Sequence, residues 1–313
     1  MRRSAAYEAC ERLARAHYEN FPVASRLLPA AARPHVAAVY AFARVADDFA
    51  DEGALTPVER LTLLNDWHER LRAAVTPGAR QPATRDVRVK EHVIDAALTF
   101  EALAETIRTC ELPVALFEDL LSAFKQDVTV RRYAAWSDVH DYCRRSANPV
   151  GRIVLRIAGH RDGALDGSSD ALCTALQLTN FWQDLAVDWA KGRLYVPLEE
   201  RDAAGAQDAD LDRRRMTPAW QAALRRCTAV TRQLFARGRG VCDGVRGRLR
   251  LELRATWIGA SHVLDRLEED AFDVFTARPA LSAADAPLLA WRLLTWRRSR
   301  GAAPAADPVV PGR

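Results

Sequence analysis

The stretch "VYAFARVADDFADEG" (residues 39–53) joins an apolar helix face to a dense acidic end. Its apolar residues recur at helical spacing, and Pro34 upstream suits the first turn of a helix. Asp47 and Asp51 are four residues apart, so they leave the same helix face. Like charges at this spacing repel, and the helix dipole disfavours anions near a C-terminus. Stability alone therefore does not explain this pair of carboxylates.

A second stretch, "QLTNFWQDLAVDWAKGRLYVP" (residues 177–197), repeats the acidic pattern. Asn180, Asp184 and Asp188 follow at four-residue steps, and aromatic and aliphatic residues border them. Gly192 then ends the expected helix. The sequence thus predicts a second row of oxygen-bearing side chains along one helix face.

Two uses of these rows can be weighed from the residues. Either row alone is equally well explained as a solvated helix face. Together, both beside aromatic residues, they favour binding of Mg²⁺, which takes carboxylates plus the oxygens of a substrate phosphate. A glycosidase-type acid/base pair is a weaker alternative, because it needs one carboxyl group with a raised pKa rather than two rows of ligands.

The remainder of the chain predicts an all-α protein. Apolar residues recur at helical spacing, and we find no alternating β-branched runs bounded by turns. The expected helices cover residues 4–19, 34–52, 56–75, 88–108, 113–125, 136–160, 169–190, 218–236, 242–275 and 282–298, and the expected loops cover 76–86, 160–170 and 201–218. No loop reads as a domain linker. We expect one helical domain over residues 1–300 and a disordered tail over 301–313, which is rich in proline and small residues.

Composition excludes several classes of function. The 313 residues carry 45 basic and 41 acidic side chains, a net charge of +4, which gives no reason to expect nucleic acid as a partner. The first twenty residues lack an apolar core of signal-peptide length. The six cysteines are scattered without zinc spacing, and no nucleotide-binding glycine motif occurs. These features predict a cytoplasmic protein with reduced thiols.

The segment "LLAWRLLTWRRSR" (residues 288–300) has two open interpretations. Its two tryptophans and four arginines suit an interfacial helix with arginines towards anionic lipid. They also suit a C-terminal helix that packs its tryptophans on the bundle. Peripheral contact with the inner face of the cell membrane is therefore one hypothesis for this segment.

The acidic stretches "YAFARVADDFADE" and "NFWQDLAVDWAKGRLYVP" resemble the two aspartate-rich motifs of the squalene/phytoene synthases, the head-to-head prenyl synthases. The resemblance extends from about His17 to Pro279. Within the family, "HYENFPVASRLLP" and "YCRRSANPVGRIVLRIAG" are most similar to the bacterial hydroxysqualene synthase branch of hopanoid biosynthesis. That branch converts presqualene diphosphate, made by one partner enzyme, to hydroxysqualene, which a flavoprotein then reduces.

The resemblance implies an isoprenoid-synthase fold, in which antiparallel helices surround a deep pocket and the two acidic rows face each other. Mg²⁺ would be held by Asp47, Asp51, Asn180, Asp184 and Asp188, with Asp48 and Glu52 in support. Arg44 and Arg193 would contact diphosphate, and Tyr142 would lie near the ionising group. The substrate chain would meet Phe21, Tyr40, Gln177 and Phe181, whose aromatic members can exclude water and stabilise a carbocation.

Two positions depart from the family pattern. Gln183 stands where many relatives have arginine, and Phe272 where several condensing relatives have tyrosine. Both are compatible with an enzyme that starts from a single diphosphate. The resemblance to the hydroxysqualene synthase branch implies Mg²⁺-dependent conversion of presqualene diphosphate to hydroxysqualene. The alternatives are condensation of two prenyl diphosphates to presqualene diphosphate, squalene or phytoene, and a non-catalytic helical scaffold.

Overall fold

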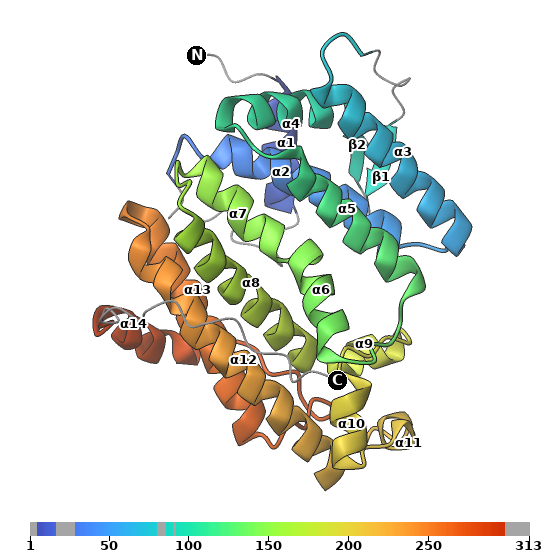
Figure 1. Ribbon diagram of the computed structural model, residues 1–313, viewed down its shortest axis with the longest axis vertical. Helices are drawn as coiled ribbons and strands as arrows, with labels where there is room; N and C mark the ends of the chain where they lie inside the picture. Colours follow the sequence, from blue (N-terminus) through green and yellow to red (C-terminus); the bar gives the residue numbers. More distant parts are fainter. Residues whose placement is uncertain (1–4, 17–28, 80–85, 90–91, 298–313) are drawn as a thin grey trace.

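The computed structural model describes residues 5–16, 29–79, 86–89 and 92–297, and these fold into packed layers of α-helices (Figure 1). The predicted helical class is confirmed. The α-helices are α1 (Ala5–Ala16), α2 (Arg33–Asp51), α3 (Pro57–Val75), α4 (Ala96–Cys110), α5 (Val114–Thr129), α6 (Trp136–Ser146), α7 (Asn148–Ile157), α8 (Gly163–Gln183), α9 (Leu185–Ala190), α10 (Leu198–Ala204), α11 (Asp208–Asp212), α12 (Pro218–Gly244), α13 (Gly247–Glu269) and α14 (Ala286–Leu294), with a 3₁₀ turn over Ala283–Asp285. None of the described helices is both long enough and apolar enough to cross a lipid bilayer.

Two groups of helices carry the two acidic rows. Helix α2 packs against α1, α3, α4 and α5, whereas α8 packs against α7, α12 and α13. Helices α5, α6 and α7 connect the groups, since α5 contacts α2 and α6 while α6 and α7 contact α8 (Figure 1). The fold therefore brings the acidic ends of α2 and α8 onto one scaffold, although about 130 residues separate them in sequence.

An aromatic cluster fixes α2 in the first group. Phe42 stacks on Trp67 of α3 with ring centroids 6.2 Å apart, and the Trp67 ring lies 4.5 Å from Phe100 of α4. The Trp67 indole N–H donates to the Phe42 carbonyl at 3.2 Å. All three rings are buried. This packing fixes the orientation of α2. It thereby also fixes the position of the acidic residues on the last turns of the helix.

A β-hairpin replaces the first part of one expected helix. Strands β1 (Asp86–Val89) and β2 (His92–Asp95) pair antiparallel, so the prediction of a helix from residue 88, in a chain without strands, is wrong here. Each strand has only four residues, too few for alternation to stand out from the helical pattern that follows. Asp95 ends the hairpin and caps α4, accepting the N–H groups of Ala97 at 2.8 Å and Leu98 at 3.2 Å.

Three further boundaries differ from expectation. Helix α8 begins inside the expected loop 160–170, because Asp162 caps it by accepting the Ala164 N–H at 2.9 Å. The expected loop 201–218 contains part of α10 and all of α11. The helix expected over 136–160 is divided into α6 and α7 at Ala147, next to Pro149. A polar cap accounts for the start of α8, whereas α7, α10 and α11 begin without a side-chain cap.

Helix α12 continues past residue 236, where we expected it to end. It extends to Gly244, and α13 begins only at Gly247, so the expected boundary between residues 236 and 242 is wrong. A Cβ atom at Gly238 would lie 2.7 Å from the backbone N and Cα of Leu172 in α8. Gly238 therefore allows α8 and α12 to approach closely.

This contact predicts the effect of adding one methyl group. Gly238→Ala should lower the free energy of unfolding by about 1–3 kcal/mol, because the backbone of Leu172 cannot move aside freely. The matched control is Gly167→Ala in α8, where nothing lies within 4 Å of the added Cβ. That variant should be neutral or up to about 1 kcal/mol more stable through helix propensity. Urea unfolding measures both, and equal stability of the two variants would contradict the close approach.

Candidate active site

The first acidic row lies on the last turns of α2 and is partly neutralised by its own helix. Arg44 donates to Asp47 Oδ2 at 3.3 Å and also to Asp48 Oδ1. Asp48 is buried, whereas 47% of the Asp47 side chain is exposed. Asp48 thus contacts Arg44 from the buried side, and its supporting role at a metal site stays a prediction. Asp47 remains accessible.

The second row crosses a helix junction. Helix α8 ends at Gln183 and α9 begins at Leu185, so the single helix expected over 169–190 is interrupted. The Asp184 N–H still donates to the Asn180 carbonyl at 2.8 Å, and the Asp188 N–H donates to the Asp184 carbonyl at 2.8 Å. The Asn180 amide also donates to Asp184 Oδ2 at 2.7 Å. The three side chains therefore keep the four-residue repeat of a continuous helix.

The segment after α9 joins the two rows. Lys191 Nζ lies 2.8 Å from Asp51 Oδ2, and Arg193 Nη2 lies 2.5 Å from Asp51 Oδ1. The Arg193 N–H donates to the Asp188 carbonyl at 2.8 Å. Gly192 between them has φ +76°, a left-handed conformation that glycine adopts without strain. The structure thus brings Asp51 and the second row to one site.

The electrostatics of the site follow from this pairing. Burial raises the pKa of Asp51, but the hydrogen bond from Lys191 and the charge of Arg193 outweigh it, so the pKa lies below its ordinary value. Burial and the neighbouring Asp184 raise the pKa of Asp188 to about 7, against the opposing charges of Arg193 and Lys191. Burial, with the neighbouring Asp48 and Asp51, also raises the pKa of Asp47 to about 6, although Arg44 contacts it. Of these three carboxyl groups, Asp51, which pairs with two cations, is the one whose pKa is lowered.

The donor set suits a hard cation. The two rows offer carboxylate and amide oxygens, the ligands that Mg²⁺ prefers. Among the residues that the structure describes, no three acidic, histidine or cysteine side chains form a ready-made metal cluster. Arginine and lysine side chains pair with these carboxylates instead. The residues fit Mg²⁺ in their chemistry, and Mg²⁺ itself remains a prediction.

A cation that the sequence reasoning missed contacts the second row. Arg278 donates to Asp184 Oδ1 through Nε and to Asp184 Oδ2 through Nη2, the latter at 3.2 Å. The neighbouring Pro279 carbonyl accepts a hydrogen bond from Gln183, one of the two positions that depart from the family pattern. A guanidinium therefore lies beside Gln183 although the local sequence has none. No signal near residue 184 could reveal it, since Arg278 is 94 residues away.

Phe272, the other position that departs from the family pattern, lies in the core at the end of α13. Phe272 is 1% exposed and belongs to the hydrophobic core. Its φ is +62°, and its N–H donates to the Leu267 carbonyl at 2.7 Å, which closes the end of α13. The aromatic ring at this position thus anchors the segment that leads to Arg278.

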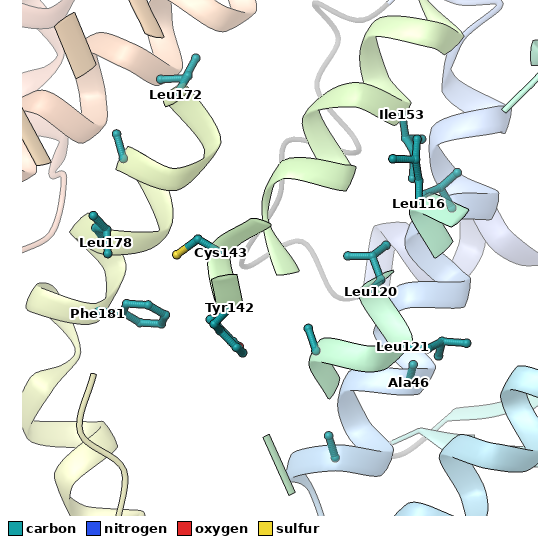
Figure 2. Close-up of a cluster of buried hydrophobic side chains, with 14 of the residues drawn as sticks. Ala46, Leu116, Leu120, Leu121, Tyr142, Cys143, Ile153, Leu172, Leu178 and Phe181 are labelled. Atoms are coloured by element: carbon teal, nitrogen blue, oxygen red, sulfur yellow. The ribbon is translucent and has the colours of Figure 1, made fainter. Parts of the chain in front are cut away.

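Aromatic side chains gather next to the acidic rows. Phe181 of α8 stacks on Tyr195 with ring centroids 3.7 Å apart and planes 3° apart. Tyr142 of α6 lies 6.0 Å from Phe181 and 5.9 Å from Tyr195, and its hydroxyl donates to Asp127 Oδ2 at 3.0 Å. Figure 2 shows Tyr142 and Phe181 close together, directed away from their helices. The sequence reasoning named Tyr142 and Phe181 but missed Asp127 and Tyr195.

The remaining predicted residues are placed as follows. Tyr40 of α2 is half-buried and packs against the hydrophobic core. Gln177 of α8 is half-buried, three residues before Asn180. Phe21 lies outside the described residues. The other predicted site residues lie on α2, α6, α8 or α9, at Asp184 between α8 and α9, or on the segment after α9.

Comparison with known proteins gives the family. The squalene/phytoene synthase family matches residues 14–285, so the chain belongs to this family. The hydroxysqualene synthase of Zymomonas mobilis is 34% identical over 267 residues, which cover 84% of this chain and 81% of that protein. The hydroxysqualene synthase of Rhodopseudomonas palustris is 32% identical over 296 residues, which cover 93% of this chain and 94% of that protein.

A solved structure agrees with the same family. The crystal structure of squalene synthase HpnC from Alicyclobacillus acidocaldarius superimposes with a TM-score of 0.75 at 37% identity. The match covers 85% of this chain and 94% of that chain. The resemblance to squalene/phytoene synthases and the helical fold expected from it are therefore confirmed.

The two cations on Asp51 predict different stability effects. Arg193→Met should lower the free energy of unfolding by about 3 kcal/mol, because Arg193 is buried and its loss leaves Asp51 and Asp188 without that charge. Lys191→Met should cost at most about 1 kcal/mol, because Lys191 is half-exposed. Urea unfolding at pH 7.5 measures both changes. Equal losses would show that Arg193 does not hold the rows together.

Proposed function

We propose that the protein is a hydroxysqualene synthase, which ionises presqualene diphosphate with Mg²⁺ and captures the rearranged carbocation with water. The products are hydroxysqualene and diphosphate. The observation that carries the proposal is the junction of the two acidic rows through Asp51, Lys191 and Arg193. Membership of the squalene/phytoene synthase family supports a prenyl diphosphate substrate, and the relatives named hydroxysqualene synthase favour this reaction within the family.

The first chemical task is to stabilise the departing diphosphate. Mg²⁺, which Asp47, Asp51, Asn180, Asp184 and Asp188 would hold, neutralises negative charge on a leaving group when bound. Arg44 and Arg193 can bind phosphate oxygens in pairs through their guanidinium groups. Lys191 and Arg278 add positive charge at the same place, so we include both in the diphosphate site.

The second task is to control the carbocation. Phe181 and Tyr142 offer aromatic faces that exclude bulk water and attract a cation by about 1 kcal/mol or more for each well-placed ring. Tyr195 extends this surface, because it stacks directly on Phe181. Capture by one positioned water then gives the alcohol.

Two alternatives remain to be separated from this proposal. Condensation of two prenyl diphosphates would use the same acidic rows, but Gln183 stands where many relatives have arginine and Phe272 where several condensing relatives have tyrosine. A non-catalytic scaffold gives no reason for both rows to be intact and joined. The proposed reaction also implies one partner enzyme that supplies presqualene diphosphate and a flavoprotein that reduces hydroxysqualene.

One assay separates the three functions. Purified protein is given presqualene diphosphate or farnesyl diphosphate, with Mg²⁺ and without NADPH, and the lipid products and released diphosphate are identified. We expect hydroxysqualene from presqualene diphosphate and no conversion of farnesyl diphosphate, with loss of all activity when a chelator removes the metal. Formation of presqualene diphosphate, squalene or phytoene from prenyl diphosphates would replace the proposal with condensation. No turnover would favour the scaffold.

We also propose that α14 makes peripheral contact with a membrane. Trp296 packs on the bundle, 5.3 Å from Trp257, as one sequence interpretation expected. Helix α14, which ends two residues before Trp296, exposes apolar side chains to solvent: Leu288 is 42%, Trp291 65% and Leu294 83% exposed. Residues 286–300 contain four arginines and no acidic residue, which suits anionic lipid. Contact here would help deliver a lipid substrate.

Vesicle binding tests the membrane contact. The variant with Leu288→Ser, Trp291→Ser and Leu294→Ser should lose binding to vesicles containing phosphatidylglycerol while keeping its helicity, because only exposed side chains change. The matched control is Val58→Ser, which alters an apolar side chain 73% exposed on α3. Cosedimentation measures binding. Absence of binding by the unmodified protein, or equal binding by the triple variant, would remove the proposal.

A further inference from the structure

The carboxyl group of Asp127 is buried beside the candidate active site without full hydrogen bonding. It lies near the end of α5 and is 8% exposed. Oδ2 accepts the hydroxyl of Tyr142 at 3.0 Å, whereas Oδ1 has no hydrogen-bond partner. A buried carboxyl oxygen without a partner destabilises the fold. Stability therefore gives no reason for an acid at this position.

The direction of this hydrogen bond limits what Tyr142 can do. A phenol has one proton, and Tyr142 donates it to Asp127. While that bond is in place, the phenol oxygen can only accept a hydrogen bond from another molecule. A water molecule that donates to Tyr142 keeps its own lone pairs available for attack on an electrophile. The pair Asp127 and Tyr142 is thus arranged to orient water.

The pair lies where the carbocation chemistry is expected. Tyr142 packs against Phe181 and Tyr195, the aromatic side chains next to the second acidic row. The charged and titratable groups that act on Asp127 are Arg193, Tyr142, Asp47 and Asp51, and Asp127 in turn acts on Tyr133 and Tyr195. Asp127 is therefore within electrostatic range of the diphosphate site without belonging to its row of ligands.

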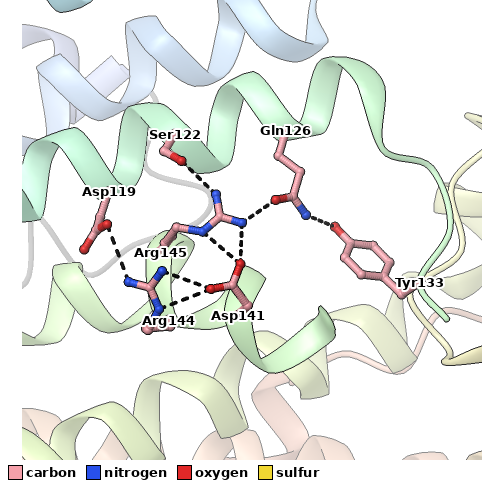
Figure 3. A network of polar contacts seen from close by, with 7 residues as sticks. All are labelled: Asp119, Ser122, Gln126, Tyr133, Asp141, Arg144 and Arg145. Atoms are coloured by element: carbon pink, nitrogen blue, oxygen red, sulfur yellow. Dashed lines mark hydrogen bonds and ion pairs between the residues drawn. The ribbon is translucent and has the colours of Figure 1, made fainter. Parts of the chain in front are cut away.

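A polar network holds the two helices of the pair together. Arg145 of α6 donates to Ser122 at 2.8 Å and to Gln126, both on α5, and pairs with Asp141 at 2.7 Å. Gln126 donates in turn to the Tyr133 hydroxyl at 3.3 Å (Figure 3). Gln126 is adjacent to Asp127, and Asp141 and Arg145 lie within one turn of Tyr142. The network fixes the separation at which the phenol reaches the carboxylate.

We propose that Asp127 positions Tyr142 to hold the capturing water and receives the proton that this water releases. The inference rests on the proposed function. In this step the water oxygen forms a bond to the cationic carbon. One water proton passes to the Tyr142 oxygen as the Tyr142 proton passes to Asp127 Oδ2. A carbocation and a carboxylate thereby become a neutral alcohol and a carboxylic acid.

The test is the distribution of products per diphosphate released from presqualene diphosphate. In Asp127→Asn, the ratio of hydroxysqualene to hydrocarbon elimination products should fall at least about 10-fold. Positioned acid–base groups typically speed a step by about 100-fold or more, so this is a conservative expectation. Tyr142→Phe should shift the ratio in the same direction, and the double variant should add little, because the two residues act as one unit. The matched control is Asp119→Asn, an acid on the same helix whose partner is Arg144 at 3.6 Å. Its ratio should equal that of the unmodified protein.

Thermal unfolding distinguishes a role of Asp127 in stability from its proposed role in water capture. Burial raises the pKa of Asp127 from 3.8 to about 7. The folded state therefore binds more protons than the unfolded chain between these values, and the contribution of Asp127 to stability falls as pH rises. Asp127→Asn should accordingly unfold at pH 8 at the same temperature as the unmodified protein or higher. A product shift with undiminished stability cannot come from loss of structure.

Each remaining outcome decides between the two proposals. Hydroxysqualene from the unmodified protein, with an unchanged product ratio in Asp127→Asn and Tyr142→Phe, would overturn this inference alone. A shift in Asp127→Asn but not in Tyr142→Phe would also overturn it, because Asp127 would then act by another route. No release of diphosphate from presqualene diphosphate by the unmodified protein would overturn the proposed function and this inference with it.

Discussion

The repulsion between two rows of carboxylates is the constraint on which the site depends. Asp51 at the end of α2 and Asp188 on α9 belong to different helix groups, and their charges oppose each other's approach. Arg193 opposes this repulsion, because its guanidinium pairs with Asp51 and its charge also acts on Asp188. Its backbone N–H donates to the backbone carbonyl of Asp188, which holds the two segments together. The aromatic core around Trp67 on one side and the close contact of α8 with α12 on the other supply the rigid supports that this junction needs.

Much of this arrangement could be read from the sequence because its signals are local. A four-residue spacing places side chains on one helix face, whatever the helix packs against. This holds for Asp47 and Asp51 and for Asn180, Asp184 and Asp188. The family motifs then indicated that the faces meet. Helix ends were less predictable, because a single cap such as Asp162 or a close approach such as that at Gly238 overrides a hydrophobic pattern.

The residues that sequence reasoning missed share a different property. Arg278 reaches Asp184 from a distant segment, and Asp127 meets Tyr142 only because α5 and α6 pack side by side. Neither residue stands in a motif of its own, and both resemble ordinary charged residues in a helical protein. Their roles come from tertiary placement, which no local spacing encodes.

The arginine and lysine contacts on the acidic rows have a consequence for how ligands enter. A metal ion arriving alone would displace Lys191, Arg193 and Arg278 from the carboxylates with which they pair, and a diphosphate arriving alone would compete with the carboxylates for the same cations. When both arrive, each ligand takes the partners that the other releases. If the protein binds both ligands as we propose, this charge pairing would couple them thermodynamically, so that each would raise the affinity for the other.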